Sequence, residues 1–351
     1  MRYNAMIISF IFLIICSGPL MVMGQTIPGD SSHYGSGDIF INPYVDEGNE
    51  PGFLQILKWF WERKSPDTDD STIAVTVSRE TPNLTQVFNP NDSLLQVTWI
   101  GHSTFLVQLD GVNFLTDPIF SERSSPIKWI GPKRMTPPAI PIDALPPVDF
   151  VLISHNHYDH LDLPTVHALG NNSKWFVPLG VKIFLESEGI TNVEELDWWS
   201  QVTIGRLKIF CTPNQHFSGR TPFDRNEYLW ASWAIISPNQ RVWFAGDTGY
   251  NSFQFKEIGG KFGPFDLALI PIGAYDPEWI MRDHHVNPFE AVGVHTDVRS
   301  KFSIGMHWGT FTLTDEPIGE PPRLLKEAVR VAALDSASFV TVPQGRTILI
   351  R

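Results

Sequence analysis

The apolar residues divide the chain into an irregular N-terminal part and a regular remainder. From residue 94 onward, short apolar runs alternate with polar or Gly- and Pro-rich stretches, as in strands and helices joined by loops. Alternating apolar positions at 97–109 meet Asp110-Gly111, a dipeptide typical of hairpin turns, before a further run at 112–116. The same pattern predicts strands at 150–154, 175–177, 207–212, 230–236, 241–245, 267–272, 303–306, 339–342 and 347–350, and helices near 163–169, 181–188, 252–261, 288–296 and 321–333.

These elements predict one layered α/β domain over residues 93–351, because strands and helices are interspersed along its whole length. Periodicity alone does not separate an open doubly wound sheet from a β-sandwich flanked by helices. The sequence contains no repeat of the length found in solenoids or propellers, so those architectures are excluded.

The first 24 residues have the pattern of a secretory signal peptide. Arg2 precedes an apolar run from Ala5 to Ile15, and a second apolar patch at 20–23 ends before a small-residue cleavage site. A retained membrane anchor is the alternative, because the apolar region is just long enough to span a bilayer. Either reading predicts the secretory pathway and a secreted or membrane-associated protein.

Residues 25–92 are rich in Gly, Ser, Pro and Asp and are predicted to be a linker with one short amphipathic helix near 53–64. Apolar residues at 53, 56, 57, 60 and 61 have helical spacing. The helix either packs on the domain or faces a membrane, and Trp59, Trp61 and the basic end favour the membrane. If it docks at a bilayer, replacing both tryptophans with Ala should weaken liposome binding.

Composition narrows the chemistry. A hydrophobic fraction of 42% excludes wholesale disorder, and a net charge of −12 argues against a nucleic-acid binder. The charge does not exclude a single phosphate group held by metal ions, which act at short range. Of the two cysteines, Cys16 lies in the leader and Cys211 in a predicted strand. A bound transition metal is therefore expected to have imidazole and carboxylate ligands.

The strongest chemical signal is Ser154-His155-Asn156-His157-Tyr158-Asp159-His160-Leu161-Asp162, which follows an apolar strand. Imidazoles clustered beside a buried strand each need a partner for their ring nitrogens, and metal ions supply one. His155 and His157 can meet one ion, while Asp159 and His160 reach another.

Each zinc ion takes about four ligands, so one short motif cannot complete two sites. Three further candidates follow predicted strands: His216, Asp247 and His307. Each of them alone could be structural. Together with the His-rich segment they predict a metal centre.

This series of ligands resembles that of the metallo-β-lactamase superfamily. Within it, the chain resembles the N-acyl-phosphatidylethanolamine-hydrolysing phospholipase D family, and the resemblance covers about residues 51–351. The matching stretches are 97–104, 114–120, 131–134, 152–162, 195–199, 244–250, 262–267, 271–275 and 306–311.

The resemblance implies a metallo-β-lactamase αββα sandwich with two zinc ions at one edge of the sheets. One zinc would be held by His155, His157 and His216, and the other by Asp159, His160 and His307, with Asp247 bridging both. Two Zn²⁺, two carboxylates and one hydroxide leave a charge of about +1, which suits an anionic phosphodiester.

The implied enzyme is a zinc-dependent phospholipase D that hydrolyses N-acyl-phosphatidylethanolamine to N-acylethanolamine and phosphatidic acid. Asp159 and His285 are the expected catalytic residues, His285 by binding or protonating the phosphate. Tyr158 and His285 are the expected substrate contacts. His102 and Asp117 are expected to brace the site.

The expected partners are a phospholipid substrate and a membrane surface, with no nucleic acid; a homodimer is left open. One rival hypothesis is a hydrolase of the same fold that acts on another phosphodiester, a lactone or a thioester. A second is a metal-free lipid-binding protein. The chain departs from the family pattern in its apolar leader and at Phe217, where Trp is expected.

Overall fold

The computed structural model describes residues 32–37, 39–45, 53–63 and 77–351. The predicted signal or anchor at 1–24 therefore lies outside the described residues. Within the described parts, no helix combines the length and apolar character needed to cross a bilayer.

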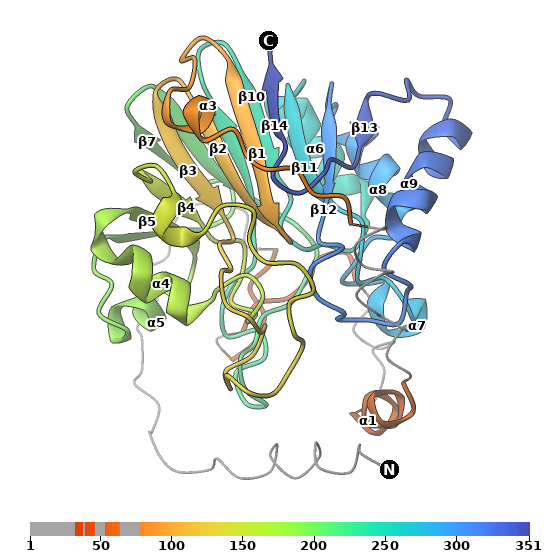
Figure 1. Ribbon diagram of the computed structural model, residues 1–351. Coiled ribbons are helices and arrows are strands. Elements are labelled where there is room, and N and C mark those ends of the chain that lie inside the picture. Colours follow the sequence, from red (N-terminus) through yellow and green to blue (C-terminus); the bar gives the residue numbers. More distant parts are fainter. Residues whose placement is uncertain (1–31, 38, 46–52, 64–76) are drawn as a thin grey trace.

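Two seven-stranded sheets lie face to face in the centre of the molecule (Figure 1). The strand order of the first sheet is β14-β1-β2-β3-β4-β5-β6. Its strands are β1 (Leu95–Gly101), β2 (Thr104–Leu109), β3 (Val112–Thr116), β4 (Phe150–Leu152), β5 (Lys174–Pro178), β6 (Val193–Leu196) and β14 (Thr347–Ile350).

The second sheet has the order β13-β12-β11-β10-β9-β8-β7. Its strands are β7 (Gln201–Ile204), β8 (Leu207–Thr212), β9 (Ser232–Ile236), β10 (Arg241–Phe244), β11 (Leu267–Pro271), β12 (Ser303–Met306) and β13 (Phe339–Val340). The first sheet thus contains the first six strands of the domain and the C-terminal strand, and the second sheet contains the strands between them.

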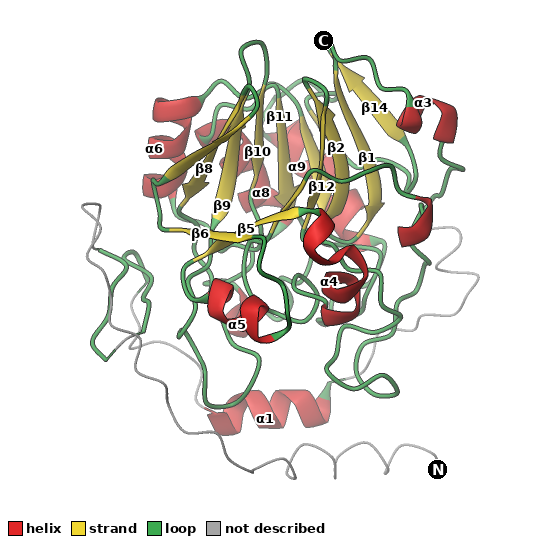
Figure 2. Ribbon diagram, turned by 90° about the vertical axis from the view of Figure 1, so that its left-hand side faces the viewer, coloured by secondary structure: helices red, strands yellow, loops and turns green. Residues whose placement is uncertain are grey.

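Helices cover the outer faces of both sheets (Figures 1 and 2). The first sheet carries α4 (Leu163–Leu169) and α5 (Val181–Ser187), and the second carries α6 (Ser252–Phe262), α8 (Pro288–Asp297) and α9 (Glu320–Val331). Helix α8 begins with a capping box between Asn287 and Glu290, followed by Pro288 in the first turn. The predicted αββα sandwich is confirmed.

The strands of the first sheet are apolar on both faces because each face is covered. In β2, Phe105 and Val107 pack between the two sheets, whereas Leu106 packs on the helix side. In β4, Phe150 points between the sheets and Val151 towards the helices. This explains why the sequence shows apolar runs here rather than a clean alternation.

Strand direction brings several strand ends to one edge. In the first sheet, β3 and β4 are parallel, and β1 has the same direction because two antiparallel pairings separate it from β3. In the second sheet, β8, β10, β11 and β12 likewise share a direction. Loops that follow these strands therefore meet at that edge, where ligand sites of such sheets form.

The sequence pattern did not predict four short elements: β6, β7, α3 (Leu84–Phe88) and α7 (Glu278–Met281). Each is too short to carry a clear period. Helix α1 (Phe53–Glu62) lies within the predicted 53–64. Within the range predicted as a linker, His33 and Phe40 are buried, and His33 Nε2 lies 2.7 Å from a carboxylate oxygen of Asp197.

Candidate metal centre

All seven predicted ligands meet at the shared edge of the two sheets. His155 follows β4 in the first sheet, whereas His216, Asp247 and His307 follow β8, β10 and β12 in the second. Six of the seven are at least nine-tenths buried, and His157 is half-buried. The sandwich therefore combines side chains that lie up to 152 positions apart in the sequence, from His155 to His307.

Three imidazoles form the first group. The Nε2 atom of His155 lies 2.8 Å from Nδ1 of His157, and Nε2 of His216 lies 3.3 Å from the same atom. Their potential ligand atoms all lie within 4.8 Å of one another. The group has the same members as the first predicted zinc site.

The second group combines imidazoles and carboxylates. The Nε2 atoms of His160 and His307 each lie 3.0 Å from Oδ2 of Asp247. They lie 3.3 and 3.2 Å from Oδ2 of Asp159. Asp247 also forms a compact group with His216 and His285, so it stands between the two sets.

Buried partners fix the orientation of several of these side chains. His160 Nδ1 contacts a carboxylate oxygen of Asp117 at 2.6 Å, and the other oxygen of Asp117 accepts the Ser154 backbone N–H. His102 Nε2 lies 2.9 Å from Oδ2 of Asp159. The structure thus places His102 and Asp117 in the bracing positions expected of them. His102 also falls within ligand distance of the second group, which sequence reasoning did not predict.

The backbone is strained where these side chains are presented. His102, Asp117 and His307 have φ values of 56°, 32° and 60°, which side-chain-bearing residues rarely adopt. Gly246, directly before Asp247, has a φ of 62°, and a Cβ there would lie 2.5 Å from Ser154 Cβ. A glycine is thus required at position 246, directly before Asp247, because the two sheets approach each other closely there.

The electrostatics of the two groups differ. Burial, together with neighbouring imidazoles, lowers the pKa of His155 and His216 well below the usual value and that of His157 to about 3. These rings are therefore neutral at physiological pH and present lone pairs. Burial opposes the charged form of His307, but Asp247 and Asp159 outweigh it and raise its pKa to about 9.

These features fit a divalent cation. Within the described residues, His160 Nε2, His307 Nδ1 and Asp247 Oδ1 are buried without a well-formed hydrogen bond. Such groups are costly inside a protein unless a partner satisfies them. The neutral imidazoles of the first group and the carboxylates of the second are ligands that Zn²⁺ and similar ions prefer. The carboxylates raise the pKa of His160 and His307, so these two rings would release a proton when a cation binds.

The other predicted residues lie around this centre. The His285 ring is 5.1 Å from that of His216, and its Nδ1 lies 3.9 Å from Oδ2 of Asp247. Tyr158 instead turns towards a cavity of about 760 Å³ beside the metal loop. Its hydroxyl donates to the Arg220 carbonyl, so its predicted substrate contact stays a prediction.

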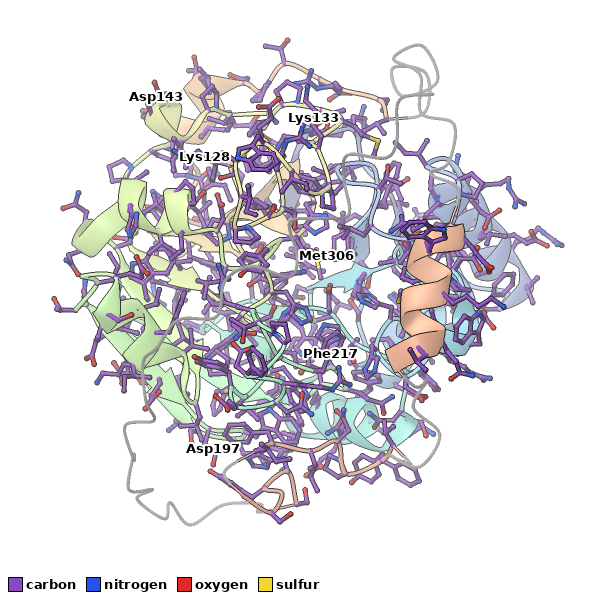
Figure 3. The ribbon with its side chains drawn as sticks, turned by 90° about the horizontal axis from the view of Figure 1, so that it is seen from below. Lys128, Lys133, Asp143, Asp197, Phe217 and Met306 are labelled. Carbon is purple, nitrogen blue, oxygen red and sulfur yellow. The ribbon has the colours of Figure 1, made fainter. Side chains whose placement is uncertain are left out.

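Figure 3 views the face on which this centre lies. Phe217, next to His216, and Met306, next to His307, lie near the middle of the view, and α1 crosses one side of it. Sequence reasoning missed Asn42, whose side chain donates to the His216 carbonyl at 2.7 Å. It also missed Arg220. Neither residue has a sequence signal, because its role depends on contacts between distant segments.

Comparison with known proteins identifies the family. The β-lactamase superfamily domain matches residues 112–308. N-acyl-phosphatidylethanolamine-hydrolysing phospholipase D 1 of Caenorhabditis elegans is 43% identical over 327 residues, which are 88% of this chain and 92% of that protein. The chain belongs to this phospholipase D family of the metallo-β-lactamase superfamily.

A second relative supports the assignment to the family, and a solved structure shows the same fold. A mitochondrial family member from Saccharomyces cerevisiae is 39% identical over 65% of this chain and 50% of its own length. A metallo hydrolase of Ignicoccus hospitalis shares the fold, with a TM-score of 0.56 and 22% identity over 74% of this chain and 99% of its own. This member of the phospholipase D family is therefore a hydrolase with a site for divalent metal.

The bracing role of Asp117 in this family member can be tested by Asp117→Asn. The amide keeps the shape but loses the charge that orients His160, so we expect metal affinity to fall by about ten- to a hundredfold. Competition with a chromogenic chelator measures it. Asp149→Asn is the matched control. Asp149 also accepts a backbone N–H, that of Asn113, but it lies at the start of β4, whereas the proposed ligands follow its end. Equal affinity of the two variants would contradict the role.

Proposed function

We propose that the protein is a zinc-dependent phospholipase D that hydrolyses N-acyl-phosphatidylethanolamine to N-acylethanolamine and phosphatidic acid. The observation that carries the proposal is the buried convergence of all seven predicted ligands at one edge of the sheets, with three imidazoles beside a set of imidazoles and carboxylates. The 43% identity to a protein named for this reaction supports the substrate class. Fold neighbours do not, because one fold hosts many reactions.

The donor set indicates which residues would hold the ions. His155, His157 and His216 would bind one zinc, and Asp159, His160 and His307 the other, with Asp247 between them. When bound, two zinc ions would supply a nucleophile from water at neutral pH and stabilise negative charge on the phosphoryl oxygens. Asp159 and Asp247 carry two negative charges against the four positive charges of two Zn²⁺ ions. A phosphodiester anion therefore finds a net positive site within an acidic protein.

His285 is the proposed contact for the phosphate. It lies beside Asp247, and among the described residues its Nδ1 has no hydrogen-bond partner. Burial lowers its pKa to about 4, although Asp247 acts against this. His285 is thus a neutral ring that can donate a hydrogen bond to a phosphoryl oxygen. An adjacent phosphate charge would favour its protonation, as needed to help a leaving group depart.

Helix α1 is the proposed membrane contact. Its Trp59 indole donates to a carboxylate oxygen of Asp315 at 2.6 Å, and Arg63 donates to the carbonyls of Leu313 and Thr314. One side of the helix is thus tied to the segment that follows His307. Leu54 and Trp61 remain 76% and 67% exposed, and such side chains partition into a lipid interface.

Two further predictions complete this proposal. The apolar leader is proposed to direct the chain to the secretory pathway, either as a cleaved signal or as a retained anchor, and N-terminal sequencing of the mature protein decides between them. The second concerns a homodimer, which the sequence leaves open and which sedimentation of the purified chain tests.

The activity is tested with purified protein and a substrate panel. We expect N-acyl-phosphatidylethanolamine in mixed micelles to yield N-acylethanolamine and phosphatidic acid, detected by mass spectrometry. Chelation and Asp247→Asn should each abolish the reaction, and metal analysis should find about two zinc ions per chain. Faster cleavage of a soluble phosphodiester, a lactone or a thioester would refute the lipid assignment. A metal-free active protein would refute the mechanism.

The role of His285 is tested by His285→Asn. Loss of proton transfer to the leaving group should lower kcat by about a hundredfold or more. Zinc content should stay that of the wild type, because His285 is outside the proposed ligand set. His167→Asn, at an exposed histidine paired with Glu188, is the control. A wild-type kcat in His285→Asn would remove the residue from the reaction.

The role of α1 is tested by Leu54→Ala/Trp61→Ala. Losing two exposed apolar side chains should weaken partitioning to phospholipid vesicles by at least about tenfold, measured by co-sedimentation. Leu349→Ala, on β14 and 48% exposed, is the control on the opposite end of the molecule (Figure 1). Trp59 is left intact because it holds the helix in place. Unchanged vesicle binding would exclude α1 as the contact.

A further inference from the structure

The side chain of Arg220, in the segment after His216, contacts the loop that carries four of the proposed ligands. One terminal nitrogen of Arg220 donates to the carbonyl oxygens of Asn156 at 2.7 Å and Leu161 at 2.8 Å. These two carbonyls stand near the two ends of the loop 155–162, so one guanidinium spans it.

Further contacts connect the same segments from both sides. The Gly219 N–H donates to the Asn156 side-chain oxygen at 2.8 Å, and the Tyr158 hydroxyl donates to the Arg220 carbonyl at 2.8 Å. The guanidinium carbon lies 4.0 Å above the Tyr158 ring and 5.1 Å from that of Phe184. Both rings hold the planar group by cation–π contact.

The backbone of Arg220 is itself fixed. The Asp224 carboxylate accepts the backbone N–H groups of Arg220 and Thr221, and the Thr221 hydroxyl donates to it as well. The turn at 220–224 therefore positions the start of the arginine side chain before the guanidinium reaches the metal loop.

We infer that Arg220 is a positioning residue that holds the metal loop 155–162 in register with His216. Arg220 is outside the proposed ligand set and acts through two carbonyls of the loop. The loop comes from the first sheet and His216 from the second, and the first group of ligands draws on both. Arg220 adds a side-chain connection between these segments and so limits how far His155 and His157 can move relative to His216.

Arginine has the shape this role requires. One terminal nitrogen of the planar guanidinium donates to both carbonyls, while the plane of the group contacts the rings of Tyr158 and Phe184. A lysine ammonium keeps the charge but loses the planar group that stacks on these rings. Arg220→Lys therefore separates geometry from charge.

The inference rests on the proposed metal centre, so its test measures zinc affinity rather than catalysis. Zinc affinity of the full-length protein is determined by competition with a chromogenic chelator. Arg220→Lys should weaken it by about ten- to a hundredfold, as is typical when a partner of the ligands is lost. Tyr158→Phe removes the hydrogen bond from the Tyr158 hydroxyl to the Arg220 carbonyl, and it should weaken zinc affinity by a smaller factor.

Arg241→Lys is the matched control. One terminal nitrogen of Arg241 also donates to two main-chain carbonyls, those of Phe262 and Gly263, but at the start of β10, far from the ligands. The Arg241→Lys variant should lower the thermal unfolding midpoint of the zinc-free protein as much as Arg220→Lys does. Its zinc affinity should stay within about twofold of wild type.

The outcomes separate the two proposals. Zinc affinity that is unchanged in Arg220→Lys, or reduced equally by Arg241→Lys, would overturn the positioning role while the metal centre stands. A wild-type chain that binds no zinc would overturn the metal centre, and the role of Arg220 with it. Selective loss in Arg220→Lys supports both.

Discussion

The structure depends on one constraint, which is the burial of imidazole and carboxylate groups at the edge where the two sheets meet. His155, His216 and Asp247 are removed from water, and within the described residues Asp247 Oδ1 and His160 Nε2 have no well-formed hydrogen bond. Burial of this kind is tolerated where a cation completes the arrangement. The fold is thus built around a site that opposes its stability until a ligand is present.

The two sheets share the task of holding that site. The first contributes the metal loop after β4, and the second contributes His216, Asp247 and His307. Backbone contacts join the sheets close to the ligands, since the Ala231 N–H donates to the Ser154 carbonyl and the Trp233 indole to that of Ile153. Rigid strands and short connections restrict the ligands to small displacements, which a metal site requires.

The same edge faces the side of the molecule on which α1 lies (Figure 2). Under the proposed function, zinc ions would make this edge positive, and α1 on the same side exposes Leu54 and Trp61, an arrangement that suits a lipid whose phosphate must leave the surface of a bilayer. The net charge of −12 does not oppose this, because the cations act at contact distance while surface carboxylates are screened. In the proposed function, binding at the bilayer and chemistry at the metals would therefore rest on different parts of the chain.

The sequence by itself determined the core elements and the positions of the candidate ligands. Apolar runs identified strands such as β9 and β11, and the density of histidine after β4 identified the proposed metal loop, because both signals are local. The tertiary structure alone decided what depends on approach between distant segments: the burial of His33, the contact of Asn42 with the His216 carbonyl, and the span of Arg220 across the loop. Short elements such as β7 and α7 were also not predicted, because they contain too few residues to show a period. A side chain whose partners are backbone atoms far along the chain leaves no periodicity or motif, so only the folded chain reveals its role.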